Sequence, residues 1–369
     1  MRDDMRIKVC MIIATLERGG AEKQLCLLTT NLDRQRFEPV VIALARGGLF
    51  EDMLSRRGVR CIVLGKKRAV SPGALFRLLR IIEGEKPDIV HTWMFTSNAY
   101  GRVAARLAGI KRTVISERCV DVWKGPLRLA VDKGLSRITD RVVANSRSVA
   151  RWLWSAGISE RLIEVVPNAF DPAGYPLKSL DGIREVGTSP RLVTVGRLLR
   201  QKRCDLVLRA MAEIVRAFPD ATVTIAGEGP CRAELQALAC ELGIREHVRM
   251  PGTVDHIPGL LLESDLFIMA SDFEGMPNAM MEAMYVGVPV VSTAAPGVTD
   301  LVRHGVTGVL VPAGDYGALA EEAIALLRDA DRRQRIALAA HQEIAEHYSV
   351  EAMVKAYERI YESVVQARG

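Results

Sequence analysis

Short apolar runs recur along the chain, separated by stretches long enough for a helix. The runs of the first half are residues 8–14, 40–45, 60–65, 88–93, 112–117, 141–146 and 163–168. Those of the second half are residues 191–196, 222–227, 247–250, 265–270, 288–292 and 308–312. Runs without polar alternation indicate strands buried on both faces, which is typical of parallel sheets covered by helices. We therefore predict an α/β fold with two doubly wound parallel-sheet domains.

The composition between these runs suggests where the domains end. Residues 171–190 are rich in Gly, Pro and Asp and have no sustained apolar period, so we interpret them as a linker. The predicted domains are then residues 1–170 and 191–348. The remaining segment, residues 349–369, begins with an amphipathic helix.

Composition narrows the class of protein. Of 369 residues, 49% are hydrophobic and 25% charged, which is ordinary for a globular enzyme. No apolar run approaches the roughly 18 residues of a membrane-spanning helix. Seven scattered cysteines form no Cys-x-x-Cys pair, which argues against a disulfide framework and favours a cytoplasmic location.

Charge is distributed unevenly along the chain. Residues 1–178 contain 31 Lys and Arg against 18 Asp and Glu, a net charge of +13. The remainder contains 19 against 26, a net charge of −7. A basic half indicates an anionic partner: nucleic acid, an anionic membrane or a phosphorylated substrate.

Two acids stand out in "FEGMPNAMMEAMYVGVPVVS", residues 273–292. Glu274 lies in a loop that follows a predicted strand, and Pro277 suits the first turn of the next helix. Glu282 lies in an otherwise apolar helix, where a carboxylate needs a specific partner such as the paired hydroxyls of a sugar. The alternative for Glu282 is an exposed acid on a surface helix.

Two further motifs follow strands in the same way. In "VGRLLRQKRCD", residues 195–205, Arg197 and Lys202 are placed to clamp a diphosphate, although a solvated basic loop would look similar. Gly19 and Gly20 open the first helix, where free N–H groups suit a phosphate or a sugar. The alternative for the glycines is a plain helix-entry turn.

Taken together, these motifs resemble the retaining glycosyltransferases of family 4, which have the GT-B architecture. The matching pieces are "GGAE" (19–22), "VANS" (143–146), "VPNAFD" (166–171), "VGRL" with Lys202 (195–202) and the stretch from Ser271 to Val291. The most specific is the pair Glu274 and Glu282, the family's Glu-x7-Glu. The resemblance implies two facing Rossmann-like domains, with the final helix crossing back to the first.

The resemblance also implies a role for each candidate residue. Arg197 and Lys202 match the pair that binds the diphosphate of a nucleoside-diphosphate sugar. Glu282 matches the acid on the ribose, and Glu274 the acid at the donor sugar. The other donor-binding residues expected from the family are Gly19, Gly20, Val254, Gly275, Met276, Pro277, Asn278 and Asp300.

Three departures from the family pattern concern single residues. His91 matches the first histidine of a His-x-His motif and is a catalytic candidate, or else a structural histidine, but Trp93 replaces the second. Ala169 stands where the family has a glycine after Pro-Asn. Asp300 stands where many members have Glu.

The function implied is transfer of a hexosyl or N-acetylhexosaminyl group, with retention, from a UDP-sugar to a glycan or polyprenyl-diphosphate-linked acceptor. No Asp-x-Asp follows a predicted strand, so we expect no metal cofactor, and the cations Arg197 and Lys202 must offset the diphosphate. Two alternatives remain: a sugar-nucleotide epimerase of the same fold, and a catalytically silent sugar-nucleotide-binding subunit. Nucleic acid is not expected, because no aromatic residues interleave the basic ones.

The basic half also suggests a membrane surface. Residues 124–141 can form a helix with an apolar stripe and a basic stripe beside it. The apolar stripe is Leu127, Val131, Leu135 and Ile138, and the basic stripe Lys133, Arg137 and Arg141. We therefore expect a peripheral enzyme on the inner face of the cytoplasmic membrane. The alternative is that the apolar stripe is core and the cations are solvated.

Overall fold

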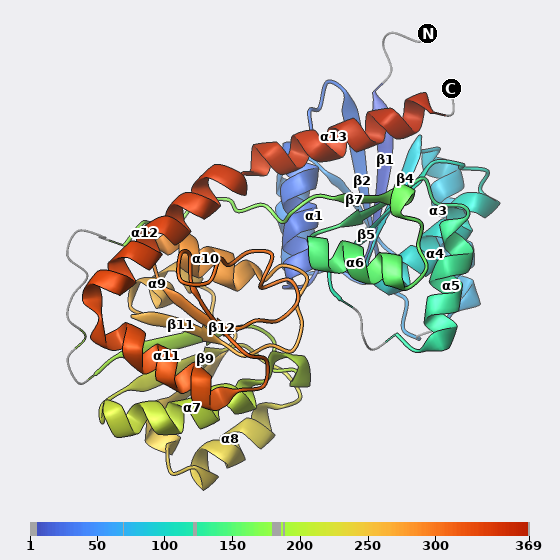
Figure 1. The fold of residues 1–369 in the computed structure, drawn as a ribbon. Helices are drawn as coiled ribbons and strands as arrows, with labels where there is room; N and C mark the ends of the chain where they lie inside the picture. Colours follow the sequence, from blue (N-terminus) through green and yellow to red (C-terminus); the bar gives the residue numbers. More distant parts are fainter. Residues whose placement is uncertain (1–5, 69, 121–123, 179–185, 187–188, 368–369) are drawn as a thin grey trace. The chain divides into compact units, whose positions relative to one another are not determined.

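The computed structural model describes residues 6–68, 70–120, 124–178, 186 and 189–367. The chain divides into two compact units (Figure 1). The first comprises Met1–Ala169 with Val350–Gly369, and the second Phe170–Ser349. Each unit has one sheet, of seven and six strands, and all the recorded strand pairs are parallel. The predicted fold class, with two parallel-sheet α/β domains, is confirmed.

The sheet of the first unit has the strand order β3-β2-β1-β4-β5-β6-β7. Its strands are β1 (Ile7–Thr15), β2 (Phe37–Arg46), β3 (Arg60–Val63), β4 (Ile89–Trp93), β5 (Thr113–Glu117), β6 (Arg141–Ala144) and β7 (Ile163–Val165). Its helices are α1 (Gly20–Asn31), α2 (Leu49–Arg56), α3 (Pro72–Glu85), α4 (Met94–Leu107), α5 (Pro126–Ser136), α6 (Arg147–Ser155) and α13 (Val350–Gln366).

Strand β1 shows why the sequence has apolar runs without alternation. Val9 and Met11 pack in a core with helices α1, α2 and α13, whereas Cys10 and Ile12 pack in a second core with α3 and α4. Because side chains alternate between the faces of a strand, both sets must be apolar when helices cover both faces.

Helix α13 belongs to the first unit although its residues end the chain. It lies beside α1 (Figure 1), and its Tyr357 and Tyr361 are fully buried in the core that α1 and β1 share. Glu358 accepts a hydrogen bond from the backbone of Asp33 at 2.9 Å and pairs with Arg36. This is the domain that was expected to receive residues 349–369.

The sheet of the second unit has the strand order β10-β9-β8-β11-β12-β13. Its strands are β8 (Arg191–Val195), β9 (Thr222–Ala226), β10 (Val248–Gly252), β11 (Leu266–Met269), β12 (Val290–Thr293) and β13 (Val309–Val311). Its α-helices are α7 (Cys204–Ala217), α8 (Arg232–Glu241), α9 (Ile257–Leu262), α10 (Asn278–Val286), α11 (Tyr316–Arg328) and α12 (Ala330–His347).

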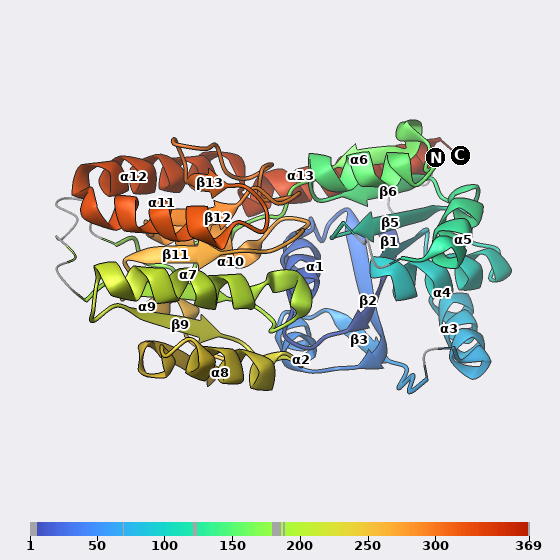
Figure 2. The same cartoon turned by 60° about the horizontal axis from the view of Figure 1, so that its bottom comes forward.

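The two faces of this second sheet are again both covered (Figure 2). Leu266 and Ile268 of β11 pack with α7, α8 and α11, and Phe267 and Met269 pack with α10. Strands β8 and β11 are neighbours near the middle of the sheet. From β8 the chain adds strands towards one edge, and from β11 it adds them towards the other edge. Ligands of such sheets bind where the order reverses, at the carboxyl ends of the strands.

Phe170, predicted as the last residue of the first domain, and Lys178 of the predicted linker both pack on the second unit. The Phe170 ring lies 4.4 Å from the ring of Tyr285 on α10, and Phe170 donates its N–H to the carbonyl of Tyr348 at 2.8 Å. Lys178 donates its N–H to the carbonyl of Val286. Residues 179–185 and 187–188 of the predicted linker lie outside the described residues.

The helix predicted over residues 124–141 is wrong at its C-terminal end. Helix α5 ends at Ser136, Arg137 follows it, and Arg141 belongs to strand β6. The three cations of the proposed basic stripe therefore do not share a helix face. Among the residues that the structure describes, no helix is both long and apolar enough to cross a membrane.

Candidate functional site

In the second unit, the loops after three neighbouring strands come together. Lys202 follows β8 and Glu274 follows β11, and their Nζ and Oε1 atoms are 2.6 Å apart. The hydroxyl of Ser271 donates to the same Oε1 at 2.7 Å. The Glu274 side chain is 8% exposed and that of Lys202 23% exposed, so this ion pair lies at the edge of the protein interior. The structure thus brings together two residues that the sequence assigned to the same site.

The loop after β12 supports the loop that carries Glu274. The backbone N–H of Glu274 donates to the carbonyl of Pro296 at 2.9 Å. Gly297 has a φ of +82°, and a Cβ on it would lie 2.5 Å from the carbonyl oxygens of Glu274 and Gly275. Only glycine fits such a conformation and such a contact. Gly297 therefore sets the position of the acid, and the sequence analysis did not single it out.

Helix α10 carries the second acid. The helix starts at Asn278 with Pro277 as its N-cap, and Gly275, Met276 and Pro277 before it are buried. Glu282 is 7% exposed and accepts a hydrogen bond from the Tyr175 hydroxyl. Burial is the main cause that raises the pKa of Tyr175, and the charge of Glu282 is the second cause. Tyr175 is thus a further site residue, which sequence reasoning placed in the linker.

A second glycine brings neighbouring loops together at the same edge. Gly227 follows β9 with a φ of +145°, and a Cβ there would lie 1.9 Å from the carbonyl oxygen of Gly196, which follows β8. The Gly196 loop leads directly to Arg197. The signal in the sequence was the "GEG" of residues 227–229, a glycine pair after a predicted strand.

The two cations after β8 differ in their surroundings. Arg197 is exposed, and no salt bridge is recorded for it within the described ranges. Lys202 is held by Glu274, as given above. Arg203 is occupied by Asp205 and Asp272, at 3.0 and 3.2 Å. Arg197, like the exposed Arg200 of the same loop, is therefore available to an anionic ligand without breaking a salt bridge recorded within the described residues.

The remaining candidates of the second unit also follow strands. Val254 is half-buried in the loop between β10 and α9, and Asp300 is half-buried in the turn after β12. The chain does contain one Asp-x-Asp sequence, Asp329 and Asp331, but it starts helix α12, where the Asp329 carboxylate accepts the N–H of Arg332 at 2.8 Å.

In the first unit, His91 is fully buried with both ring nitrogens engaged. Nδ1 lies 2.7 Å from the Tyr361 hydroxyl, and Nε2 lies 2.8 Å from Ser116 Oγ. Burial, with the charge of Arg118 second, lowers the pKa of His91 to about 3. The neutral ring donates to one partner and accepts from the other. His91 thus joins α13 to the sheet, and these contacts favour the structural alternative over the catalytic one.

Trp93, at the position of the missing second histidine, is also buried. Its ring centroid lies 4.9 Å from Cζ of the buried Arg118. Arg118 donates to Asn168 Oδ1 at 2.5 Å and to the Tyr357 hydroxyl at 3.2 Å. Next to Asn168, Ala169 has no positive φ, so its backbone needs no glycine. Two of the three departures from the family pattern, Trp93 and Ala169, therefore lie in one buried core, whereas Asp300 lies in the second unit.

Gly19 and Gly20 begin helix α1, as the sequence predicted. Gly19 is the N-cap with an extended φ of −163°. A Cβ on Gly19 would lie 2.2 Å from an oxygen of Glu22, whose carboxylate also accepts the Thr15 hydroxyl at 3.2 Å. An anion at this helix start would have to displace the flexible Glu22 side chain.

Comparisons with known proteins agree with this arrangement. Residues 18–173 match the family model described as Glycosyltransferase Family 4, and residues 180–343 match Glycosyl transferases group 1. The chain belongs to the GT-B glycosyltransferases. The two matches lie largely in the first and the second unit, and they include all the site residues predicted from the sequence, whereas Tyr175 lies between them.

The individual relatives share 30% identity or less with the chain. The chain is 30% identical over 232 residues to N-acetyl-alpha-D-glucosaminyl L-malate synthase of Bacillus anthracis, covering 62% of this chain and 61% of that protein, less than two thirds of its length. It is 26% identical to the lipopolysaccharide core biosynthesis glycosyltransferase LpsE of Rhizobium meliloti, covering 92% and 94%. The structure of Anabaena Alr3699/HepE, solved with UDP and glucose, superimposes with a TM-score of 0.86 at 23% identity, over 97% and 100% of the chains. This last likeness shows the fold.

Proposed function

We propose that this glycosyltransferase transfers a hexosyl or N-acetylhexosaminyl group from a UDP-sugar to a glycan or lipid-linked acceptor, with retention of configuration and without a metal ion. The observation that carries the proposal is the contact between Lys202 and Glu274 at the carboxyl ends of β8 and β11. This contact supports the proposal, because a cation suited to a phosphate and an acid suited to a sugar hydroxyl lie together at the edge where such sheets bind ligands.

The proposed roles follow from charge and position. The diphosphate is bound by Arg197 and Lys202, of which Arg197 is exposed and has no salt bridge within the described ranges. Glu282 on α10 accepts hydrogen bonds from the ribose hydroxyls. As the sugar–phosphate bond breaks, negative charge grows on the leaving diphosphate, and fixed cations stabilise that transition state. Glu274 orients the donor sugar once the phosphate has taken over Lys202.

The donor and the acceptor are proposed from relatives. UDP is favoured because HepE was solved with UDP and glucose. A lipid-linked or polysaccharide acceptor is favoured because the relatives include a lipopolysaccharide core glycosyltransferase and a phosphatidylinositol monomannoside mannosyltransferase. Peripheral binding to the inner face of the membrane is favoured by the charge of +13 over residues 1–178 and by exposed Leu127 and Val131 on α5.

Retention and independence of metal have direct tests. The protein is incubated with UDP- and GDP-sugars and short lipid-linked or oligosaccharide acceptors, with EDTA or with Mg²⁺, and the anomeric configuration of the product is determined by NMR. We expect an α-linked product from an α-linked donor, at equal rates in both conditions. Inversion, or a strict need for Mg²⁺, would contradict the proposal.

The two alternatives give different results in the same experiment. An epimerase would change the donor without an acceptor, and a silent subunit would bind UDP but release no product.

A pair of variants tests the role of Arg197. Arg197→Gln is compared with the matched control Arg200→Gln, since Arg200 is an exposed cation of the same loop. We expect only the first to lose turnover, by about 100-fold, as for the loss of one charge-stabilising group.

A further inference from the structure

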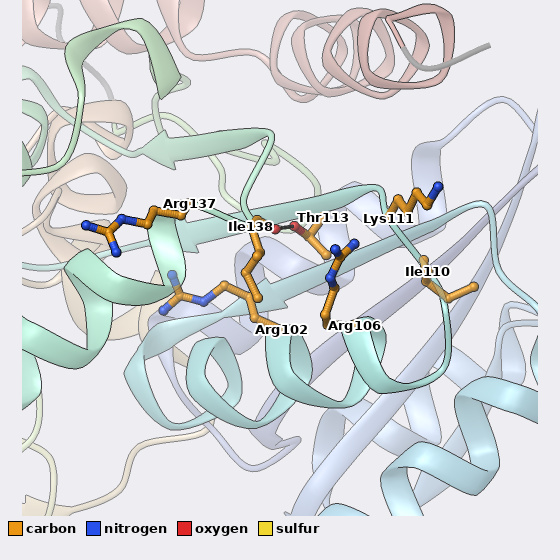
Figure 3. A pocket seen from close by; sticks show the side chains of 7 residues that line it. All are labelled: Arg102, Arg106, Ile110, Lys111, Thr113, Arg137 and Ile138. Atoms are coloured by element: carbon orange, nitrogen blue, oxygen red, sulfur yellow. Dashed lines mark hydrogen bonds between the residues drawn. The ribbon is translucent and has the colours of Figure 1, made fainter.

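The cations of a small pocket in the first unit do not converge. Arg106, Lys111 and Arg137 line this pocket, but their charged ends point apart (Figure 3). They therefore do not offer one ligand a shared set of donors. In the second unit the opposite holds at Glu274, where two donors converge on a single carboxylate oxygen.

The two oxygens of the Glu274 carboxylate have different surroundings. Lys202 Nζ donates to Oε1 at 2.6 Å, and the Ser271 hydroxyl donates to the same oxygen at 2.7 Å, so both lone pairs of Oε1 are used. For Oε2, no hydrogen bond is recorded among the residues that the structure describes, and Oε2 is not one of the enclosed side-chain atoms that lack a partner. Oε2 is therefore open to solvent, and it is the oxygen of Glu274 that a ligand can reach.

Ser271 is itself held firmly. It is fully buried and stands two residues after the end of β11. Its carbonyl accepts the Thr293 hydroxyl at 2.9 Å, and Thr293 is the last residue of the neighbouring strand β12. A buried hydroxyl on a fixed backbone keeps its direction, so it can orient a carboxylate before a ligand arrives.

Binding of a diphosphate changes what holds Glu274. In the proposed function the phosphate takes over Lys202, so the ammonium group no longer holds Oε1. The Ser271 hydroxyl is then the recorded donor that remains on this oxygen. It has one hydrogen to donate, so it fixes Oε1 and leaves Oε2 to accept a hydrogen bond from a hydroxyl of the sugar.

We propose that Ser271 is a positioning residue for the donor sugar: its hydroxyl holds Oε1 of Glu274 so that Oε2 faces a sugar hydroxyl in the reacting complex. The inference rests on the proposed function and adds to it a residue to which no role was given above. Ser271 does not touch the sugar and acts through Glu274. Loss of its hydroxyl therefore affects the sugar and its transfer, whereas the nucleotide remains bound by Arg197 and Glu282.

The test compares Ser271→Ala with the matched control Ser292→Ala. Ser292 is also fully buried, near the end of β12, and its hydroxyl donates to the carbonyl of Thr293 at 3.2 Å. Each variant loses one buried hydroxyl, and in Ser271→Ala the lost hydroxyl is the one that donates to Glu274. Thermal unfolding confirms that both variants fold. Calorimetry then gives the affinity for UDP, and steady-state kinetics gives the turnover with the UDP-sugar that the unmodified protein transfers.

We expect Ser271→Ala to lower turnover by about tenfold and to leave the UDP affinity within about twofold, because it loses a charge-assisted hydrogen bond that acts on the sugar. Ser292→Ala should change turnover and UDP affinity by less than about twofold. Equal losses of turnover in the two variants, or a loss of UDP affinity as large as the loss of turnover, would overturn the proposal.

A double-mutant cycle separates positioning from a merely structural role. If Ser271 acts through Glu274, adding Ser271→Ala to Glu274→Ala should lower the remaining turnover by less than about twofold. A further loss of about tenfold in that background would show that Ser271 acts independently of Glu274, and the proposal would be wrong. Transfer by the unmodified protein tests the proposed function separately. Without such transfer both proposals fail, whereas unchanged turnover in Ser271→Ala rejects this inference and leaves the proposed function standing.

Discussion

The buried His91 predicts that the first unit loses stability in mild acid. In the folded protein burial lowers the pKa of its imidazole to about 3, whereas an unfolded chain has a histidine pKa of about 6.5. Between these values the unfolded chain binds a proton that the folded unit does not bind. Stability is therefore highest above pH 6.5 and falls as the pH drops towards 3, by about 1.4 kcal/mol per pH unit.

The size of the effect can be worked out for a window above the carboxylate pKa values. Between pH 7 and pH 5, linkage for one histidine with these pKa values lowers the free energy of unfolding by about 2 kcal/mol. His91 is the one histidine before residue 247, and all four tryptophans lie before residue 155. Urea unfolding followed by tryptophan fluorescence therefore reports on the unit that contains His91.

The variant His91→Gln removes the titrating group. It is expected to be less stable at pH 7, because the flexible Gln amide does not hold its donor and acceptor at the positions of the two ring nitrogens that bond to Tyr361 and Ser116. Its loss of stability between pH 7 and pH 5 should be smaller than that of the unmodified protein by about 2 kcal/mol. His256→Gln, at an exposed histidine of the second unit, serves as the control and should change nothing. If His91→Gln and the unmodified protein show the same pH dependence, the linkage argument is wrong.

Further predictions concern the donor site. Lys202→Ala should lower turnover by about 100-fold, and Glu274→Gln should impair transfer more than UDP affinity; calorimetry with steady-state kinetics checks both, and full activity of either variant would reject its role. Glu282→Gln should weaken UDP binding, and Tyr175→Phe, which removes the hydroxyl that orients this carboxylate, should do so by a smaller factor; unchanged UDP affinity in calorimetry would exclude a ribose contact. Gly297→Ala should lower stability by at least about 1–2 kcal/mol, as judged by urea unfolding, because of its positive φ; a neutral effect would show that the loop can shift.

The strands were predictable because burial on both faces determines which residues a strand itself can contain. A strand covered on both faces has to be apolar along its covered length, as β11 and residues 9–14 of β1 are, so a local window of sequence contains the signal. The same holds for Glu274 and Lys202, since each lies in the loop that follows such a strand. Parallel strands bring their carboxyl ends to one edge, and this rule turns two separate local motifs into one site.

Helix α5 shows where local pattern fails. The alternative interpretation of its apolar stripe was core, yet Leu127 and Val131 are 78% and 38% exposed, and the buried residue of the helix is Asp132. Asp132 is buried because Arg102, thirty residues earlier, and Lys124 neutralise it. A buried charge depends on partners that are distant in sequence, and periodicity within one segment does not contain that information.

The same limit explains why the supporting residues of the site were missed while its charged residues were found. Glu274 is recognisable as an acid after a strand, but Gly297 matters only because the backbone of the neighbouring loop passes within van der Waals distance of it. Tyr175 matters only because the segment that carries it packs across α10, next to Glu282. Gly297 positions Glu274 and Tyr175 contacts Glu282, and both acids can be recognised from the sequence. Neither Gly297 nor Tyr175 has a motif of its own that would mark it. A site can thus be located from the residues that touch the ligand, whereas the residues that hold these in place are found by asking which backbone and which hydroxyl lie against each buried carboxylate.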